Sequence, residues 1–314
     1  MNDSYFSVNQ KCRDILESIL ILAIIMFSGC ENRERKVVAK IPDLRDGNSI
    51  AERFTLEKKN GYTLLTIINP WQGVKNFNQT YNLIRKGYEV PAELDSSAVI
   101  FVPVKKIICM STTHAAMISA LGEDNSISGM SGARFLYNKT LGRLVDKGMI
   151  EEVGYEENLN KELILKVAPE LIIMYGIGSE SAGYIGKIKE LGFKVIFNGD
   201  YLETDPLGKA EWIKVFGALF CKESKADSIY QSEVEKYNDL KTYINKNINN
   251  RPKVLLGYPF KDTWYISPGN SFISKLITDA GGDYIWKNSV SSVSMPVGLE
   301  NVYLHALRAD FWLN

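Results

Sequence analysis

Apolar residues along the chain form short continuous runs that alternate with segments of helical spacing. The run KKIICM (residues 105–110) predicts a buried strand, and residues 111–122 place apolar side chains at three-residue steps, as an amphipathic helix does. Residues 160–176 show a helix, a proline and then another apolar strand. Strands that alternate with helices predict mostly parallel sheets flanked by helices, so the fold class is α/β.

An antiparallel hairpin is predicted before these units. Residues 53–71 contain two apolar stretches on either side of Asn60-Gly61. This dipeptide favours a two-residue turn of type I′, in which both turn residues have positive φ. We therefore expect two paired strands with the tip of the hairpin at Asn60.

Helices replace strands after Asp205. Pro206 at a first helical position behind an Asp or Thr cap predicts a helix start, and the apolar segment 210–220 continues that helix. After a polar break, a second helix is predicted over Ser224–Lys246; its roughly 25 residues would span about 37 Å, enough to connect two lobes. Its apolar stripe consists of Ala226, Tyr230, Val234, Tyr237, Leu240, Ile244 and Ile248.

A new α/β pattern follows Pro252. Strands are predicted at residues 254–260 and 263–267, a helix at 271–282, and a last strand at 310–313. The chain therefore divides into an N-terminal α/β lobe, connecting helices that include the inter-lobe helix, and a C-terminal α/β lobe. Their boundaries are residues 46–205, 206–248 and 249–314.

The N-terminus has the pattern of an export signal. The apolar run Ile19–Phe27 is shorter than the roughly 20 residues that span a bilayer, but fits the apolar region of a signal peptide. Ser28 and Gly29 directly before Cys30 resemble a lipobox, so residues 1–29 are expected to be removed and Cys30 to carry lipid. Residues 30–45 would then be a tether outside the cytoplasm. A buried N-terminal helix with an incidental cysteine is the alternative.

The balanced charge of the chain argues against one class of partner. The 37 basic and 37 acidic residues balance, and no basic stripe gathers on one segment, which argues against a nucleic-acid partner.

With Cys12 in the removed segment and Cys30 modified, Cys109 and Cys221 remain. They are either a disulfide or two free thiols.

Catalytic and metal-binding motifs are absent from the sequence. His114 and His305 are the only histidines, so a site of three imidazoles is impossible and no metal site is expected. The sequence contains no GxSxG, P-loop or HExxH motif, so we expect no enzyme activity. Aromatic residues lie instead near predicted strand ends, where they could line a cleft for a planar ligand or pack in the core. These are Tyr175, Tyr201, Trp264 and Tyr265.

Seven stretches, in this order, resemble one family. The chain is similar to the ABC-transporter substrate-binding proteins of the iron-chelate and cobalamin class (the Fe/B12 periplasmic-binding domain family), particularly lipoprotein forms of Bacteroidetes-like bacteria. The stretches are STTHAAMISALG (111–122), ISGMS (127–131), NKELILKVAPELIIMYG (160–176), LETDPLGKAEWIKVFGALF (202–220), RPKVLLG (251–257), TWYISPGNSFISKLITDAGGDYIW (263–286) and GLENV (298–302).

The resemblance implies a non-enzymatic, monomeric binding protein. Two lobes joined by one long helix would hold an iron chelate (siderophore or haem) or cobalamin between them, with no resident cofactor. The protein would deliver this ligand to an ABC permease dimer with its ATPase subunits. Ligand contacts would come from Thr112, Thr113, Arg134, Tyr175, Trp264 and Tyr265.

The resemblance also implies one permease-docking glutamate on each lobe. These map onto Glu162 and Glu300, which precede strand entries by similar distances in the two halves of the chain. Two ordinary solvated helix glutamates are the alternative. For the protein as a whole, the alternatives are an envelope enzyme outside the cytoplasm and a surface scaffold that uses the fold without a ligand.

The C-terminal lobe is short for this family. Only residues 252–314 are available for it, where a domain of this kind usually has on the order of 100 residues or more. We therefore expect a partial second lobe, with an unpaired strand at the edge of its sheet and exposed apolar side chains.

Overall fold

A parallel sheet organises the N-terminal lobe. The computed structural model describes residues 49–155, 158–176, 188 and 191–314, which all lie in the compact unit Asp43–Asn314. Across this described part, five strands pair in parallel in the order β7-β6-β5-β8-β9, as the sequence predicts for the fold class. Their bounds are β5 (Ile107–Cys109), β6 (Ile127–Met130), β7 (Glu151–Glu152), β8 (Leu171–Met174) and β9 (Val195–Phe197).

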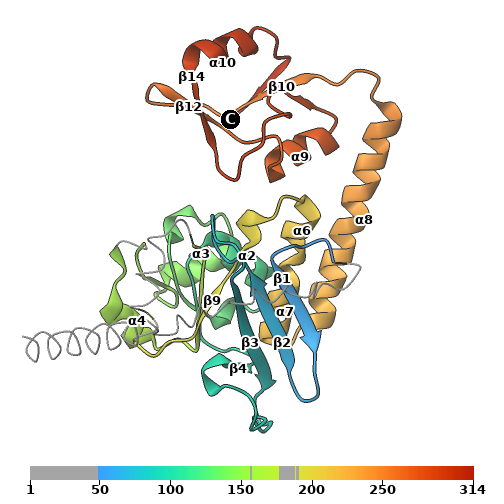
Figure 1. Cartoon of the computed structure of the whole chain (residues 1–314). Coiled ribbons are helices and arrows are strands. Elements are labelled where there is room, and N and C mark those ends of the chain that lie inside the picture. Colours follow the sequence, from blue (N-terminus) through green and yellow to red (C-terminus); the bar gives the residue numbers. More distant parts are fainter. Residues whose placement is uncertain (1–48, 156–157, 177–187, 189–190) are drawn as a thin grey trace, which may run out of the picture. The chain divides into compact units, whose positions relative to one another are not determined.

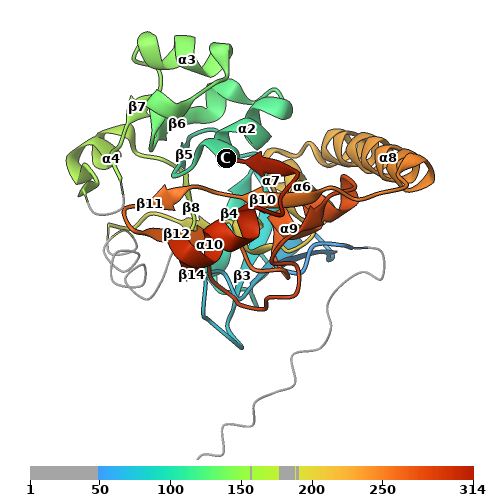
Figure 2. The ribbon, with the colours of Figure 1, turned by 90° about the horizontal axis from the view of Figure 1, so that it is seen from above.

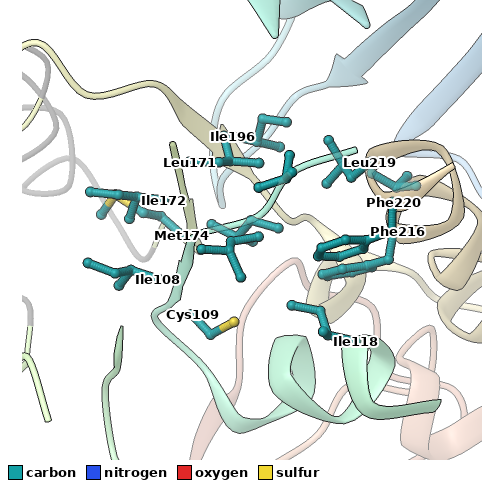
Figure 3. Close-up of a cluster of buried hydrophobic side chains, with 14 of the residues drawn as sticks. Ile108, Cys109, Ile118, Leu171, Ile172, Met174, Ile196, Phe216, Leu219 and Phe220 are labelled. Atoms are coloured by element: carbon teal, nitrogen blue, oxygen red, sulfur yellow. The ribbon is translucent and has the colours of Figure 1, made fainter. Parts of the chain in front are cut away.

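Helices cover this sheet and close its core. Strands β5, β8 and β9 are buried along their whole length, which is typical of parallel strands covered on both faces. Figure 3 shows Ile118 and Phe216 among the strand side chains. In the described residues, the helices around this sheet are α2 (Thr112–Ala120), α3 (Lys139–Asp146) and α4 (Lys161–Val167), with α6 (Pro206–Glu211) and α7 (Ile213–Phe220) from the connecting segment.

Polar caps define where these helices begin. The side chain of Ser111 accepts a hydrogen bond from the Thr113 amide at the start of α2, and that of Asn160 accepts one from the Leu163 amide at the start of α4. Asp205 accepts from the Leu207 amide at 2.8 Å ahead of Pro206, which confirms the predicted helix start. The helix does not continue to residue 220, because α6 ends at Glu211 and α7 starts after Trp212.

A second sheet packs beside the first. Of the described strands, β1 (Phe54–Lys58), β2 (Thr63–Ile68), β3 (Asn78–Arg85) and β4 (Val99–Val102) pair in chain order, the last pair in parallel. The hydroxyl of Tyr81 donates to the carbonyl of Val195 at 2.7 Å and so joins β3 to β9. The sequence pattern does not predict β3 or β4.

The hairpin forms as predicted, but its type I′ turn is wrong. Lys58 pairs with Thr63, so the loop has the four residues 59–62 rather than two. Gly61 has φ of 87°, whereas Asn60 is not among the residues with positive φ. A type I′ turn needs positive φ at both central residues, so the observed four-residue loop is not a type I′ turn.

The long helix is α8 (Glu223–Asn247), an uninterrupted helix in Figure 1. Its predicted apolar stripe is confirmed in part. Ala226 and Tyr230 are buried in the core of the N-terminal lobe, but Leu240 is 67% exposed. In the second half, the Tyr237 hydroxyl donates to Asp279 at 2.8 Å, and the side chains of Ile244 and Ile248 lie against Gly281. No helix in the described ranges is long and apolar enough to span a bilayer.

The C-terminal lobe (residues 249–314) has two small sheets, and Figure 2 looks onto its helix α10. In the described chain, one sheet is parallel with the order β13-β10-β15 and the other antiparallel with the order β11-β12-β14. The elements are β10 (Lys253–Leu256), β11 (Pro259–Phe260), β12 (Thr263–Ile266), α9 (Phe272–Asp279), β13 (Asp283–Tyr284), β14 (Met295–Gly298), α10 (Leu299–Ala306) and β15 (Phe311–Leu313).

Strand β15 lies at the edge of its sheet with its side chains uncovered. Phe311, Trp312 and Leu313 are 56%, 58% and 46% exposed. This agrees with the expectation of an exposed apolar edge. Of the cysteines in the described residues, Cys109 is buried and Cys221 half-buried, and both are free thiols.

Gly217→Ala should destabilise the protein. A Cβ at Gly217 would lie 2.6 Å from the Cβ of Ala226, so α7 and α8 would have to separate. We expect a loss of about 1–3 kcal/mol in the free energy of unfolding, measured by thermal and urea denaturation. Gly142→Ala is the matched control, because nothing lies within 4 Å of its added Cβ in helix α3. It should gain about 0.5–1 kcal/mol. Equal stability of the two variants would contradict the close contact.

Candidate functional site

The strand order of the parallel sheet reverses between β5 and β8. From β5 the chain proceeds outward through β6 and β7, and then returns to the other side of β5 to form β8 and β9. Ligands in open α/β sheets bind outside the carboxyl ends of the strands at such a reversal. Thr112 and Thr113 follow β5, and Tyr175 follows β8. The structure thus brings three of the predicted ligand-binding residues to the same edge.

A line of aromatic rings extends from this edge. The ring of Tyr175 lies 6.5 Å from that of His114 and 6.4 Å from that of Tyr201, both in edge-on geometry. The Tyr201 hydroxyl donates to the carbonyl of Gly176, and Trp71 pairs with Gly176 in an isolated bridge. A Cβ on Gly176 would come within 2.8 Å of the Trp71 Cβ, so only glycine permits this approach.

Trp71 and Tyr201 line a cavity of about 690 Å³. Its volume is in the range that small-molecule sites occupy, and loops of both lobes contribute to it. The N-terminal lobe supplies Arg53, Asn69, Trp71, Gln72, Gly73, Val74, Lys75, Tyr201, Leu202, Glu203 and Thr204. The C-terminal lobe supplies Ser267, Pro268, Asn270, Ser271, Phe272, Ile273, Ser291, Ser292, Val293 and Ser294.

The carboxylate of Glu203 supports this cavity from behind. It is 2% exposed and accepts hydrogen bonds from the amides of Glu52 and Arg53 and from the indole of Trp212, at 2.9, 3.0 and 3.0 Å. Burial raises the pKa of Glu203, and these donors oppose that rise. The donors fix the main chain that carries Arg53 at the cavity wall.

The carboxylate of Glu211 holds residues 50 and 51, just before Glu52, in the same way. Its carboxylate accepts from the amides of Ile50 and Ala51, both at 2.9 Å, and pairs with Lys214 at 2.8 Å. Isolated acids in apolar surroundings, such as Glu211 beside Trp212, are the signal in the sequence that could have identified this pair of buried carboxylates.

His114 is completely buried at the start of α2. Burial lowers the pKa of His114 to about 3, against a weaker upward influence of the Ile173 backbone. The ring is therefore neutral at physiological pH and packs near Tyr175 and Phe216. In the described part of the chain, no cluster of three or more His, Cys, Asp or Glu side chains could hold a metal ion.

Arg134 lies on the same edge of the sheet but does not line the cavity. Its guanidinium is stacked over the rings of Phe135 and Tyr155 at 4.7 and 5.7 Å. Glu152 holds the loop by accepting from the amides of Gly132 and Ala133 at 3.1 and 2.7 Å. The arginine is thus preorganised and exposed.

Trp264 and Tyr265 do not reach the cavity. Trp264 is 5% exposed, and its indole donates to the carbonyl of Leu256 at 3.0 Å within a core cluster of the C-terminal lobe. Tyr265 is exposed, because successive residues of a strand face opposite sides. Their contact with a ligand remains a prediction from the resemblance.

The lining residues Arg53 and Trp71 and the serine-rich segment 291–294 were missed from the sequence. Arg53 and Trp71 lie at the two ends of the stretch that predicts a hairpin, and their meeting with segment 291–294 depends on tertiary structure. An aromatic residue followed by Gly73 in a polar loop after a strand is the one local signal for this wall.

Glu162 and Glu300 are both exposed, each in the first turn of its helix, α4 and α10. Neither makes a side-chain hydrogen bond or an ion pair with another described residue. Their geometry leaves both carboxylates accessible to a partner. Cys30, the signal segment and the tether lie outside the described residues.

Comparisons with known proteins place the fold. No protein-family profile matches the chain. The chain is 30% identical over 332 residues to the uncharacterized lipoprotein MJ0878 of Methanocaldococcus jannaschii, covering 94% of this chain and 78% of that protein.

Two solved structures share the architecture. The periplasmic heme binding protein HutB of Vibrio cholerae superposes with a TM-score of 0.52 and 17% identity, over 66% of this chain and 75% of that one. The ABC-type Fe3+-hydroxamate transport system of Saccharomonospora viridis DSM 43017 gives 0.50 and 18%, over 67% and 74%. The chain therefore has the fold of periplasmic binding proteins, in agreement with the fold class predicted from the sequence.

His114→Met should reduce the acid sensitivity of folding. Because the folded-state pKa of His114 is depressed to about 3, the unfolded chain takes up the proton first, and stability is lost as pH falls below about 6.5. The contribution between about pH 7 and about pH 5 is roughly 2 kcal/mol, measurable by urea unfolding. Met117→Leu in the same helix, which removes no titratable group, should keep the wild-type slope. A wild-type slope in His114→Met would refute the assignment.

Proposed function

We propose that this chain, which belongs to the same protein family as the uncharacterized lipoprotein MJ0878 of Methanocaldococcus jannaschii, is the substrate-binding component of an ABC importer. The observation that carries the proposal is the cavity of about 690 Å³. Loops of two α/β lobes line it, beside the carboxyl edge of a parallel sheet at the reversal of strand order. The protein binds its ligand there and releases it to the permease.

The ligand is an iron chelate (siderophore or haem) or cobalamin. Trp71, Tyr201 and Phe272 give the cavity aromatic walls that can stack on a planar or conjugated ligand. The names of the solved neighbours, a heme binding protein and a hydroxamate transport system, support the first two. Thr112, Thr113, Tyr175 and Arg134 extend the same edge and are secondary contacts.

Delivery requires a docking surface and an anchor. The exposed carboxylates of Glu162 and Glu300 offer one acceptor on each lobe to arginines of a permease dimer with its ATPase subunits. Lipid on Cys30, with residues 30–45 as the tether, would hold the exported protein at the cell envelope. The relative named as a lipoprotein supports this location.

A ligand panel with visible absorption tests the binding function. The protein is incubated with a ferric siderophore, haem or cobalamin and then desalted, and we expect one absorption band to remain with the protein. Trp71→Ala should lose most of the retained ligand, because it removes an aromatic wall of the cavity. Trp312→Ala is the control, since Trp312 is exposed and lies outside the cavity. No retained band and no shift in Trp fluorescence or Tm with any ligand would refute the function.

Charge reversal tests the docking residues. Glu162→Lys and Glu300→Lys should leave ligand affinity unchanged and slow transport by the cognate importer. Each exposed ion pair contributes about 1 kcal/mol or less, so we expect a decrease of a few-fold for each variant and a larger one for the double variant. Glu233→Lys on the exposed face of α8 is the control. Uptake at the wild-type rate in the double variant would remove both residues from the interface.

A further inference from the structure

We infer that the cavity takes an anionic, oxygen-rich ligand and that Arg53 supplies its main charged contact. The inference rests on the proposed function and names the class of substrate. The charges of the residues that line the cavity support it. Among the lining residues, all within the described part of the chain, the charged ones are Arg53, Lys75 and Glu203.

The negative charge in this set does not face the cavity. Glu203 is 2% exposed, and its carboxylate oxygens accept hydrogen bonds from two main-chain amides and the Trp212 indole. Arg53 and Lys75 make no ion pair with any described residue. The charge that the walls present to a ligand is therefore positive.

The main chain of Arg53 is fixed before a ligand arrives. Its amide donates to Glu203 at 3.0 Å, and its carbonyl accepts from the Ile68 amide at 2.8 Å. Its Nε is buried and has no hydrogen-bond partner in the described residues. The guanidinium carries five N–H donors, so a ligand oxyanion at the cavity wall can accept a charged hydrogen bond from it. The planar guanidinium suits carboxylate geometry, which a lysine does not match.

The facing wall is uncharged and rich in hydroxyl groups. Side chains of the C-terminal lobe that line it include five serines and Asn270, and the N-terminal lobe adds Thr204 and two amides. Such groups donate hydrogen bonds to ligand oxygens and carry no charge that would repel an anion. The serines are Ser267, Ser271, Ser291, Ser292 and Ser294, and the two amides are Asn69 and Gln72.

The combination favours a chelate that carries oxyanions. A ferric tris-catecholate and the two carboxylates of haem both meet this description, whereas a cationic ferric trihydroxamate does not. The binding assay compares these three probes with the full-length protein in detergent, using quenching of Trp fluorescence to obtain Kd. We expect at least one anionic probe to bind roughly tenfold or more tightly than the cationic one, with an affinity that falls as salt rises.

Variants assign the effect to Arg53. Arg53→Gln should weaken the preferred anionic probe by roughly tenfold to a hundredfold, the usual effect of losing a charged hydrogen bond, and Arg53→Lys should weaken it less. Lys75→Gln, at an exposed position, gives a smaller loss without risk to folding. The matched control is Arg85→Gln, because Arg85 lies outside this cavity and pairs with Glu223 at 3.8 Å.

The outcomes separate the two levels of the proposal. Preferred binding of the cationic probe, or unchanged anion affinity in a folded Arg53→Gln protein, overturns the anionic specificity and leaves the binding function intact. If none of the probes binds, and cobalamin does not bind either, both proposals fail. An anionic preference that Arg53→Gln abolishes and Arg85→Gln preserves supports the inference.

Discussion

The structure depends on two buried carboxylates that hold the main chain where the described lobe begins. Glu203 and Glu211 together accept the amides of Ile50, Ala51, Glu52 and Arg53. A buried carboxylate is tolerated only when donors replace water, and each charged hydrogen bond contributes about 1.5–3 kcal/mol. These contacts set the start of β1, the position of Trp212 and the wall of the cavity. The start of the lobe and the shape of the cavity wall thus depend on one group of hydrogen bonds.

Both lobes contribute chemistry of different kinds to the cavity. The N-terminal lobe supplies the cations and the rings of Trp71 and Tyr201, and the C-terminal lobe supplies neutral hydroxyls and the ring of Phe272. Lys275 on α9 pairs with Asp205 at 3.5 Å and with Asp279 at 3.4 Å, and Lys209 on α6 lies 5.1 Å from the Phe272 ring. Ion pairs between partly exposed groups are weak. These contacts therefore bring α6 and α9 together without holding them tightly.

The sequence predicts what local pattern controls and misses what only distant segments create. Buried runs such as residues 107–109 specify the parallel sheet, and Thr112, Thr113 and Tyr175 lie at its edge as expected. Arg53 could not be identified, because its role comes from a loop more than a hundred residues away. Trp264 looked like a ligand contact by its place near a strand end, but alternation along β12 buries it. The same limit applies to Leu240, whose helical spacing says nothing about which part of α8 meets a lobe.

The close packing of Gly217 against Ala226 fixes the first turn of α8 to α7. The first turns of this 25-residue helix pack into the N-terminal lobe, whereas its second half contacts the C-terminal lobe through Tyr237, Lys241, Ile244 and Ile248. The helix is roughly 37 Å long, so bending it by a few degrees moves its far end by a few ångströms. A displacement of that size is comparable to a hydrogen-bond length. Bending of α8 can therefore change the width of the cavity without either lobe changing its own packing.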